Sequence, residues 1–205
     1  MKLVFQTPLA RRESRKRDSF LRKEKKMGFV EKKNQNVAKL VFGGLLVALG
    51  ILLPQAFHIF GTSGGSMFLP IHIPVLMAGM LLGPYYGGII GFLVPILSSL
   101  LTGMPPVPKV YFMLVELITY GIVIGVMIRR SNVYISLLMA MISGRILYGC
   151  SLVVGVKILH LTAPFANQAA FLGGIVTGIP GILLQFLILP ALYKALKKGG
   201  IAFER

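Results

Sequence analysis

Two ionisable side chains stand out because they lie within long apolar stretches of the sequence. Glu116 is the one acidic residue between Glu31 and Glu204, and Arg145 lies in the apolar stretch that follows. A charged side chain in the hydrocarbon region of a membrane is energetically costly, and by default it marks a functional site or a specific ion pair. We therefore consider both residues as candidates for contact with a polar ligand. A purely structural Glu–Arg bridge is an equal alternative.

The expected heights of the two charges leave direct contact open. By helical rise, Glu116 lies about 9 Å below the outer end of its span and Arg145 about 20 Å below the outer end of the next one. The long arginine side chain would have to extend towards the outer face for the two groups to meet. The sequence therefore allows this ion pair without requiring it.

Each charge has a tyrosine near it. Tyr120 lies one helical turn from Glu116 on the same face, and Tyr148 follows Arg145 by three residues. A lining of this kind suits a small polar molecule that is flat or carries a carboxylate. The alternative is that the tyrosines only pack against neighbouring helices.

Two further side chains could form hydrogen bonds to such a ligand. Gln185 lies in the last apolar stretch, and His72 lies between two isoleucines. His72 could donate to a ligand or cap a broken helix, and we favour the structural role. The three histidines, the single cysteine and the one intramembrane acid show no metal-ligand spacing, so we expect neither a metal nor another cofactor.

One short motif would suggest catalysis. Residues 61–64, GTSG, match the GxSG pattern of rhomboid-like intramembrane proteases, whose serine is activated by a histidine on another span. Here Ser63 lies in a glycine-rich loop, and neither His72 nor His160 lies deep within a later span. A Walker A lysine loop is absent as well. We therefore expect no enzyme, and an intramembrane hydrolase stays an alternative.

The elements that must position these side chains are long apolar segments. Of the 205 residues, 55% are apolar and only 14% are charged, which is typical of polytopic membrane proteins. We predict an all-α integral membrane protein of the cell membrane with six transmembrane helices. The six expected spans cover about residues 38–56, 68–83, 85–101, 111–128, 133–158 and 169–192.

Small residues indicate how two of these helices pack. Glycines recur every fourth residue at Gly79, Gly83, Gly87 and Gly91, and Pro84 interrupts the series. Small residues let helix backbones approach closely where lipid supplies no hydrophobic driving force. The pattern predicts a packed hairpin of two helices with a tight turn at Gly83 and Pro84.

The basic residues predict the orientation of the helices. Arg129 and Arg130 follow the fourth expected span, and further lysines follow the sixth, whereas the expected outer loops contain only Lys109 and Lys157. Because positive charge is enriched in cytoplasmic loops, we expect both termini in the cytoplasm.

The expected organisation is a membrane domain, residues 38–198, between a basic cytoplasmic tail, 1–37, and a short tail, 199–205. Residues 1–26 could be a dispensable extension, because Met27 offers a second start. The basic tail also contains acids and few aromatic residues, and it precedes a span. These features favour contact with lipid headgroups over nucleic acid.

From residue 37 onwards the sequence resembles the substrate-specific S components of energy-coupling factor (ECF) transporters. The resemblance rests on a first span of small residues followed by LPIHIPVLMAGMLLGPYYGGIIGFLVPILSSLLTGMPP, ELITYGIVIGV and SGRILYG. It implies a six-helix protein that captures a vitamin or related micronutrient from outside the cell. It also implies partners, namely a transmembrane coupling subunit and two cytoplasmic ATPases.

The resemblance also implies roles for individual residues. Gly44 and Ala48, four residues apart in the first span, match the small-residue face that docks on the coupling subunit in this family. The loop after the first span would act as a lid. The lid residues are Gly61, Ser63, Gly64 and Gly65. The residues expected to bind substrate are Glu116, Tyr120, Arg145, Tyr148, Gln185 and His72.

The family's substrates are varied, and the resemblance does not choose among them. An intramembrane arginine beside tyrosine and glutamate fits an acid that carries hydroxyls or amides, since arginine binds a carboxylate through two hydrogen bonds. Pantothenate is therefore the first candidate, and a pyrimidine or riboflavin comes next. A stand-alone secondary transporter with Glu116 as its proton site is an alternative, although we find no clear internal repeat of one half in the other.

Overall fold

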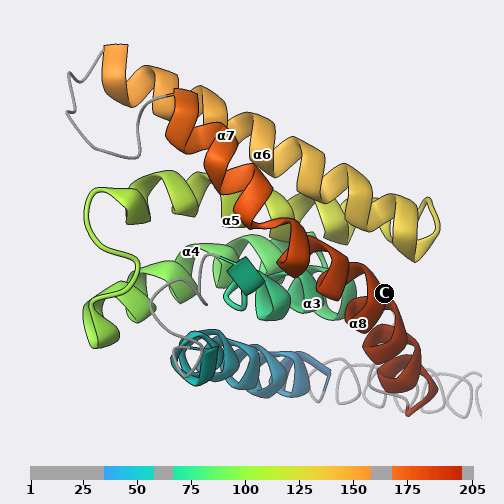
Figure 1. Ribbon diagram of the computed structural model, residues 1–205. Helices are drawn as coiled ribbons and strands as arrows, with labels where there is room; N and C mark the ends of the chain where they lie inside the picture. The colour runs from blue at the N-terminus through green and yellow to red at the C-terminus, as the bar shows by residue number, and fades with distance from the viewer. Residues whose placement is uncertain (1–34, 58–66, 158–167, 200–205) are drawn as a thin grey trace, which may run out of the picture. The chain divides into compact units, whose positions relative to one another are not determined.

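The computed structural model describes residues 35–57, 67–157 and 168–199. All regular structure in these ranges is helical (Figure 1), as predicted. Five helices are long and apolar enough to cross a membrane: Gln35–Phe57, α4 (Pro84–Thr102), α5 (Lys109–Met127), α6 (Val133–Lys157) and α8 (Ile179–Lys198). Two shorter helices are α3 (His72–Leu82) and α7 (Gln168–Thr177). The chain divides into two units, residues 1–41 and 42–205, and the description below concerns the second.

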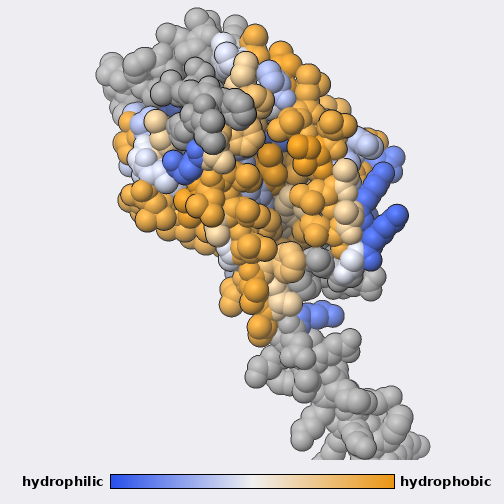
Figure 2. All heavy atoms as spheres, turned by 60° about the horizontal axis from the view of Figure 1, so that its bottom comes forward, coloured by the Kyte–Doolittle hydropathy of each residue, from blue (hydrophilic) through white to orange (hydrophobic). Residues whose placement is uncertain are grey.

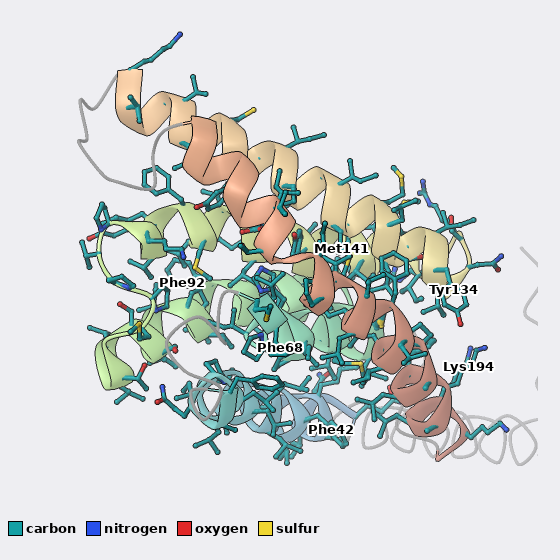
Figure 3. All side chains as sticks on the ribbon, in the orientation of Figure 1. Phe42, Phe68, Phe92, Tyr134, Met141 and Lys194 are labelled. Carbon is teal, nitrogen blue, oxygen red and sulfur yellow. The ribbon has the colours of Figure 1, made fainter. Side chains whose placement is uncertain are left out.

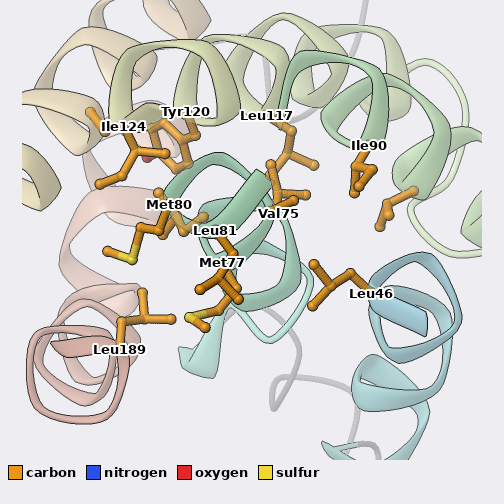
Figure 4. Close-up of a cluster of buried hydrophobic side chains, with 14 of the residues drawn as sticks. Leu46, Val75, Met77, Met80, Leu81, Ile90, Leu117, Tyr120, Ile124 and Leu189 are labelled. Carbon is orange, nitrogen blue, oxygen red and sulfur yellow. The ribbon is translucent and has the colours of Figure 1, made fainter. Parts of the chain in front are cut away.

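The central element of the 42–205 unit is the short helix α3. It packs against α4, α5 and α8, and ten of its 11 residues are buried. Figure 4 shows side chains of α3 meeting side chains from all around it. The labelled contributors are Val75, Met77, Met80 and Leu81 of α3, together with Leu46, Ile90, Leu117, Tyr120, Ile124 and Leu189. The core of the unit therefore lies around α3.

Helix α3 is shorter than the predicted span of residues 68–83. It begins at His72, because the backbone of Leu69 has a positive φ of 51° and Pro70 follows. At 11 residues it is about 16 Å long, roughly half the thickness of the hydrocarbon core. The total of six spans therefore stays a prediction.

The tight turn predicted at Gly83 and Pro84 is present. Helix α3 ends at Leu82, Gly83 has a φ of 101°, and α4 begins at Pro84. A positive φ of this size is readily adopted only by glycine. The glycine face of α4 also packs closely on α5, since a Cβ atom at Gly87 would meet the carbonyl of Gly121, and one at Gly121 would meet the carbonyl of Gly87. Small residues thus bring these backbones into contact.

The predicted sixth span is divided into two helices. Helix α7 ends at Thr177, and α8 begins at Ile179 with a proline, Pro180, in its first turn. Proline has no backbone N–H and cannot continue the hydrogen bonding of the preceding helix. A single uninterrupted helix over residues 169–192 was therefore the wrong prediction.

The described surface has the composition expected of a membrane protein. Apolar side chains cover most of the face in Figure 2. Many of them are large and exposed, such as Leu100, Leu183 and Leu187. Tyr134 at the start of α6 and Lys194 near the end of α8 lie at the same end of the unit (Figure 3). This arrangement agrees with the charge pattern, and the cytoplasmic location of that end stays a prediction.

Candidate functional site

The carboxylate of Glu116 is the centre of a buried polar cluster. Glu116 lies on α5 and is only 2% exposed. Its Oε1 accepts a hydrogen bond of 2.9 Å from the hydroxyl of Tyr120, one turn along the same helix. Nη1 of Arg145 on α6 lies 3.2 Å from the same oxygen, and Nε2 of His72 on α3 lies 3.8 Å from it. We call these four residues the Glu116 cluster; they join α3, α5 and α6.

The ion pair that the sequence left open is therefore present. Arg145 reaches Glu116 directly, and its side chain keeps an exposed fraction of only 19%. An ion pair taken out of water is favourable only when its geometry is good and its remaining polar atoms find partners. The partners of the other guanidinium atoms are therefore informative.

Several nitrogen atoms of the cluster are buried without a hydrogen-bond partner in the described part of the chain. They are Nδ1 and Nε2 of His72 and Nε and Nη2 of Arg145. Buried polar atoms in proteins nearly always have a partner, and an exception needs an explanation. A bound polar ligand with hydrogen-bond acceptors would provide these partners.

His72 does not have the capping role that the sequence favoured. It is the first residue of α3, and the start of that helix has no side-chain capping hydrogen bond. The imidazole is 1% exposed, and its ring centroid lies 5.3 Å from that of Tyr120. His72 therefore belongs to the polar cluster, with its ring held against an aromatic neighbour.

Glycines make room for this arrangement, and the sequence reasoning missed them. A Cβ atom at Gly144 would collide with the ring of Tyr120, and one at Gly178 would lie 3.4 Å from Nη2 of Arg145. Gly144 directly precedes Arg145 in the sequence, so its position beside the charged residue was a usable signal. Gly178, at the break between α7 and α8, could not be connected to Arg145 without the fold.

Gln185 and Tyr148 have other neighbours. Gln185 is 1% exposed, and its Nε2 donates to the backbone carbonyl of Leu69 at 3.4 Å, which ties α8 to the segment before α3. The ring of Tyr148 is 8% exposed and packs with Phe112 and Leu152. Both residues are buried as expected of a lining, and their contact with substrate stays a prediction.

The first long helix presents two different small-residue faces. Gly43 and Gly50 point inward, because Cβ atoms there would meet Ile90 and Val94 of α4. Gly44 and Ala48 are exposed, and a Cβ atom at Gly44 would have nothing within 4 Å. The residues predicted to dock on a coupling subunit therefore lie on the accessible face.

Some predicted residues lie outside the described ranges. These are the expected lid residues Gly61, Ser63, Gly64 and Gly65, together with His160 and the basic tail. The hydrolase alternative, which depends on Ser63, therefore has no structural test. Among the described residues, no group of three or more His, Cys, Asp or Glu side chains could hold a metal ion.

Comparison with known families gives one match. A family model described as "ECF transporter, substrate-specific component" matches residues 38–193. The chain belongs to this family. Comparisons with curated proteins and with solved structures gave no match.

The match confirms the resemblance that the sequence motifs indicated. It identifies a multi-pass membrane protein that serves as a transporter subunit. All four members of the Glu116 cluster, as well as Gly44 and Ala48, lie within the matched residues. In a substrate-specific component, a buried polar cluster with unpaired donors is the natural candidate for the substrate site.

Proposed function

We propose that this ECF substrate-specific component captures a water-soluble vitamin or related micronutrient from outside the cell and delivers it when docked on an ATP-driven coupling module. The observation that supports this proposal best is the Glu116 cluster. It is polar, buried among apolar helices, and contains donors whose partners would come from a ligand. Pantothenate, a pyrimidine and riboflavin are the substrates that the sequence nominated.

Within this proposal the four cluster residues have different roles. Arg145 and His72 contact the substrate, because their nitrogen atoms are the ones without partners. Glu116 orients Arg145 through their ion pair, and Tyr120 orients Glu116 through its hydroxyl. Such support keeps the ligand-binding groups in place before the ligand arrives, which lowers the cost of binding.

Gln185 and Tyr148 complete the proposed lining. Gln185 acts mainly by holding the carbonyl of Leu69, three residues before His72. It would thereby fix the start of α3 and the position of the imidazole. Tyr148 extends the aromatic wall beside Arg145, where its ring packs with Phe112.

Delivery of the substrate requires the partner proteins that the family implies. We propose that Gly44 and Ala48 form the docking face for a transmembrane coupling subunit, with two cytoplasmic ATPases supplying the energy. The supporting observation is that this face is small and exposed while the opposite glycine face is used within the fold. A flat face of this kind lets another helix approach closely.

Uptake into proteoliposomes tests the transport proposal. Vesicles that contain this protein together with the coupling subunit and both ATPases should accumulate the bound vitamin only when ATP is supplied at the ATPase side. Vesicles that contain this protein alone are the control. Equal uptake by the protein alone under a proton gradient would contradict the proposal and support the secondary-transporter alternative. Oε1 of Glu116 already holds two donors, which suits a proton-cycling carboxyl poorly.

A further inference from the structure

We infer that the ligand is uncharged where it meets the Glu116 cluster and that it offers two hydrogen-bond acceptors side by side to Arg145. The inference rests on the proposed function and narrows its substrate class. The fitting chemistry is the edge of an amide, a lactam or a nitrogen heterocycle, and a carboxylate fits poorly.

The first reason is that the charge of Arg145 already has a counter-ion. Nη1 lies 3.2 Å from Oε1 of Glu116, and the carboxylate is almost fully buried. With a neutral imidazole at His72, the net charge of the cluster is zero. A site of zero net charge in an apolar surrounding favours a neutral guest, because an added ion would stay uncompensated there.

The second reason is the position of the donors that are left. Nε and Nη2 share one edge of the planar guanidinium group, and both are buried without a partner in the described residues. This edge presents two parallel N–H groups, a geometry that binds two neighbouring acceptor atoms. Carbonyl oxygens and ring nitrogens of neutral heterocycles supply such pairs without adding charge.

His72 extends the recognition by one more polar contact. Its two ring nitrogens are both unpartnered in the described residues, and a neutral imidazole carries one donor and one acceptor. It can therefore adapt to either kind of group on the ligand. The ring of Tyr120 beside it gives the same side of the cluster an aromatic surface.

The remaining cation near the cluster does not change this balance. Lys109 is the first residue of α5, and seven residues of helix place it about 10 Å along the axis from Glu116. An anionic group held by Arg145 would therefore lack a second cation in contact with it. On this reasoning pantothenate, the acid that the sequence placed first, becomes less suitable than a neutral pyrimidine or riboflavin.

A fractionation experiment tests the inference on a ligand whose identity is still open. Yeast extract, a source of water-soluble vitamins, is separated at pH 8 into the fraction that an anion exchanger retains, the fraction that a cation exchanger retains, and the fraction that neither retains. Each fraction is added to the purified protein in detergent. Thermal stabilisation is measured, and the bound molecule is identified by mass spectrometry after washing.

We expect the unretained fraction to stabilise the protein and to yield the bound molecule. Stabilisation by the anionic fraction alone, or by the cationic fraction alone, would overturn the inference while leaving solute capture intact. A folded protein that is stabilised by none of the three fractions would contradict the proposed function, and the inference would fall with it. The two failures are therefore distinguishable.

Two variants connect the result to the cluster. Arg145→Gln should weaken binding of the molecule identified from the unretained fraction at least tenfold. Glu116→Gln removes the counter-ion with little change of shape, so Arg145 would carry an uncompensated charge. We expect this variant to bind nicotinate at least tenfold more tightly, relative to nicotinamide, than the unmodified protein does. An unchanged acid-to-amide ratio in folded Glu116→Gln protein would overturn the charge argument.

Discussion

Replacing Arg145 with methionine should lower the free energy of unfolding by about 3–5 kcal/mol, the usual cost of removing one partner from a buried ion pair. Methionine keeps much of the aliphatic volume of the arginine side chain and removes only the charge and its donors. Glu116, 2% exposed, would then keep the Tyr120 hydroxyl as its hydrogen-bond donor. The variant therefore isolates the electrostatic part of the interaction.

The size of the effect follows from the geometry. Two unit charges 3.2 Å apart attract each other by about 5 kcal/mol at an effective dielectric constant of about 20. Part of this attraction is offset by the desolvation of both groups. We therefore expect a coupling energy of about 2–4 kcal/mol between the two residues in a double-mutant cycle.

The assay is reversible unfolding in detergent of four proteins: the unmodified chain, Glu116→Gln, Arg145→Met and the double variant. The double variant should recover most of the stability that Arg145→Met loses, because neither charge is then left alone. Arg129→Met is the matched control. Arg129 is exposed at the end of α5, and its loss should change stability by less than about 0.5 kcal/mol.

Additive effects would refute this reasoning. If the double variant lost the sum of the two single losses, Glu116 and Arg145 would not interact in the folded protein. If Arg145→Met were as stable as the Arg129→Met control, the buried ion pair would contribute nothing measurable. Either result would remove the basis for assigning Glu116 the role of orienting Arg145.

Three further changes test other parts of the structure. Gly121→Ala should lower stability by about 1–3 kcal/mol, because its methyl group would collide with the carbonyl of Gly87; a loss no larger than that of Gly173→Ala, which faces open space, would contradict this packing. Gly44→Leu should abolish co-purification with the coupling subunit and leave vitamin affinity within about twofold; a parallel loss of affinity would show that the docking assignment is wrong. Gln185→Leu should cost about 1–3 kcal/mol in thermal unfolding, because a backbone carbonyl loses its donor; a tenfold loss of affinity at unchanged stability would instead indicate direct contact with substrate.

Much of the helical architecture was predictable from local patterns. Apolar length marked the long helices, and the glycine series around Gly83 and Pro84 marked the turn between α3 and α4. The division of the last span was also signalled locally, by Gly178 and Pro180, although apolar length alone predicted one continuous helix. Length and composition find apolar segments well, but they do not show where a segment bends.

The start of α3 was harder to predict, because a distant part of the chain is involved in it. Gly181 of α8 packs on the backbone of Met67 and Phe68, and Gln185 binds the carbonyl of Leu69. These contacts join residues that are more than 100 positions apart, so no local pattern contains them. A uniformly apolar segment was therefore expected to form a longer helix than it does.

The candidate site was predictable in its residues but not in its contacts. Intramembrane charge alone identified Glu116 and Arg145, and helical spacing added Tyr120. The depth estimate placed the two charges at different heights, because it counted along each helix from its own end. The relative tilt and offset of helices come from packing, and for that reason the 3.2 Å contact and the role of His72 could only come from the structure.

The central claim is that this ECF substrate-specific component binds its solute at the Glu116 cluster. Calorimetric titration of the purified protein and of Arg145→Gln with a panel of water-soluble vitamins tests it most directly. We predict one saturable ligand at a ratio of one to one, and an affinity at least tenfold weaker in the variant. A folded protein that binds no member of the panel, or a variant with unchanged affinity, would contradict the account.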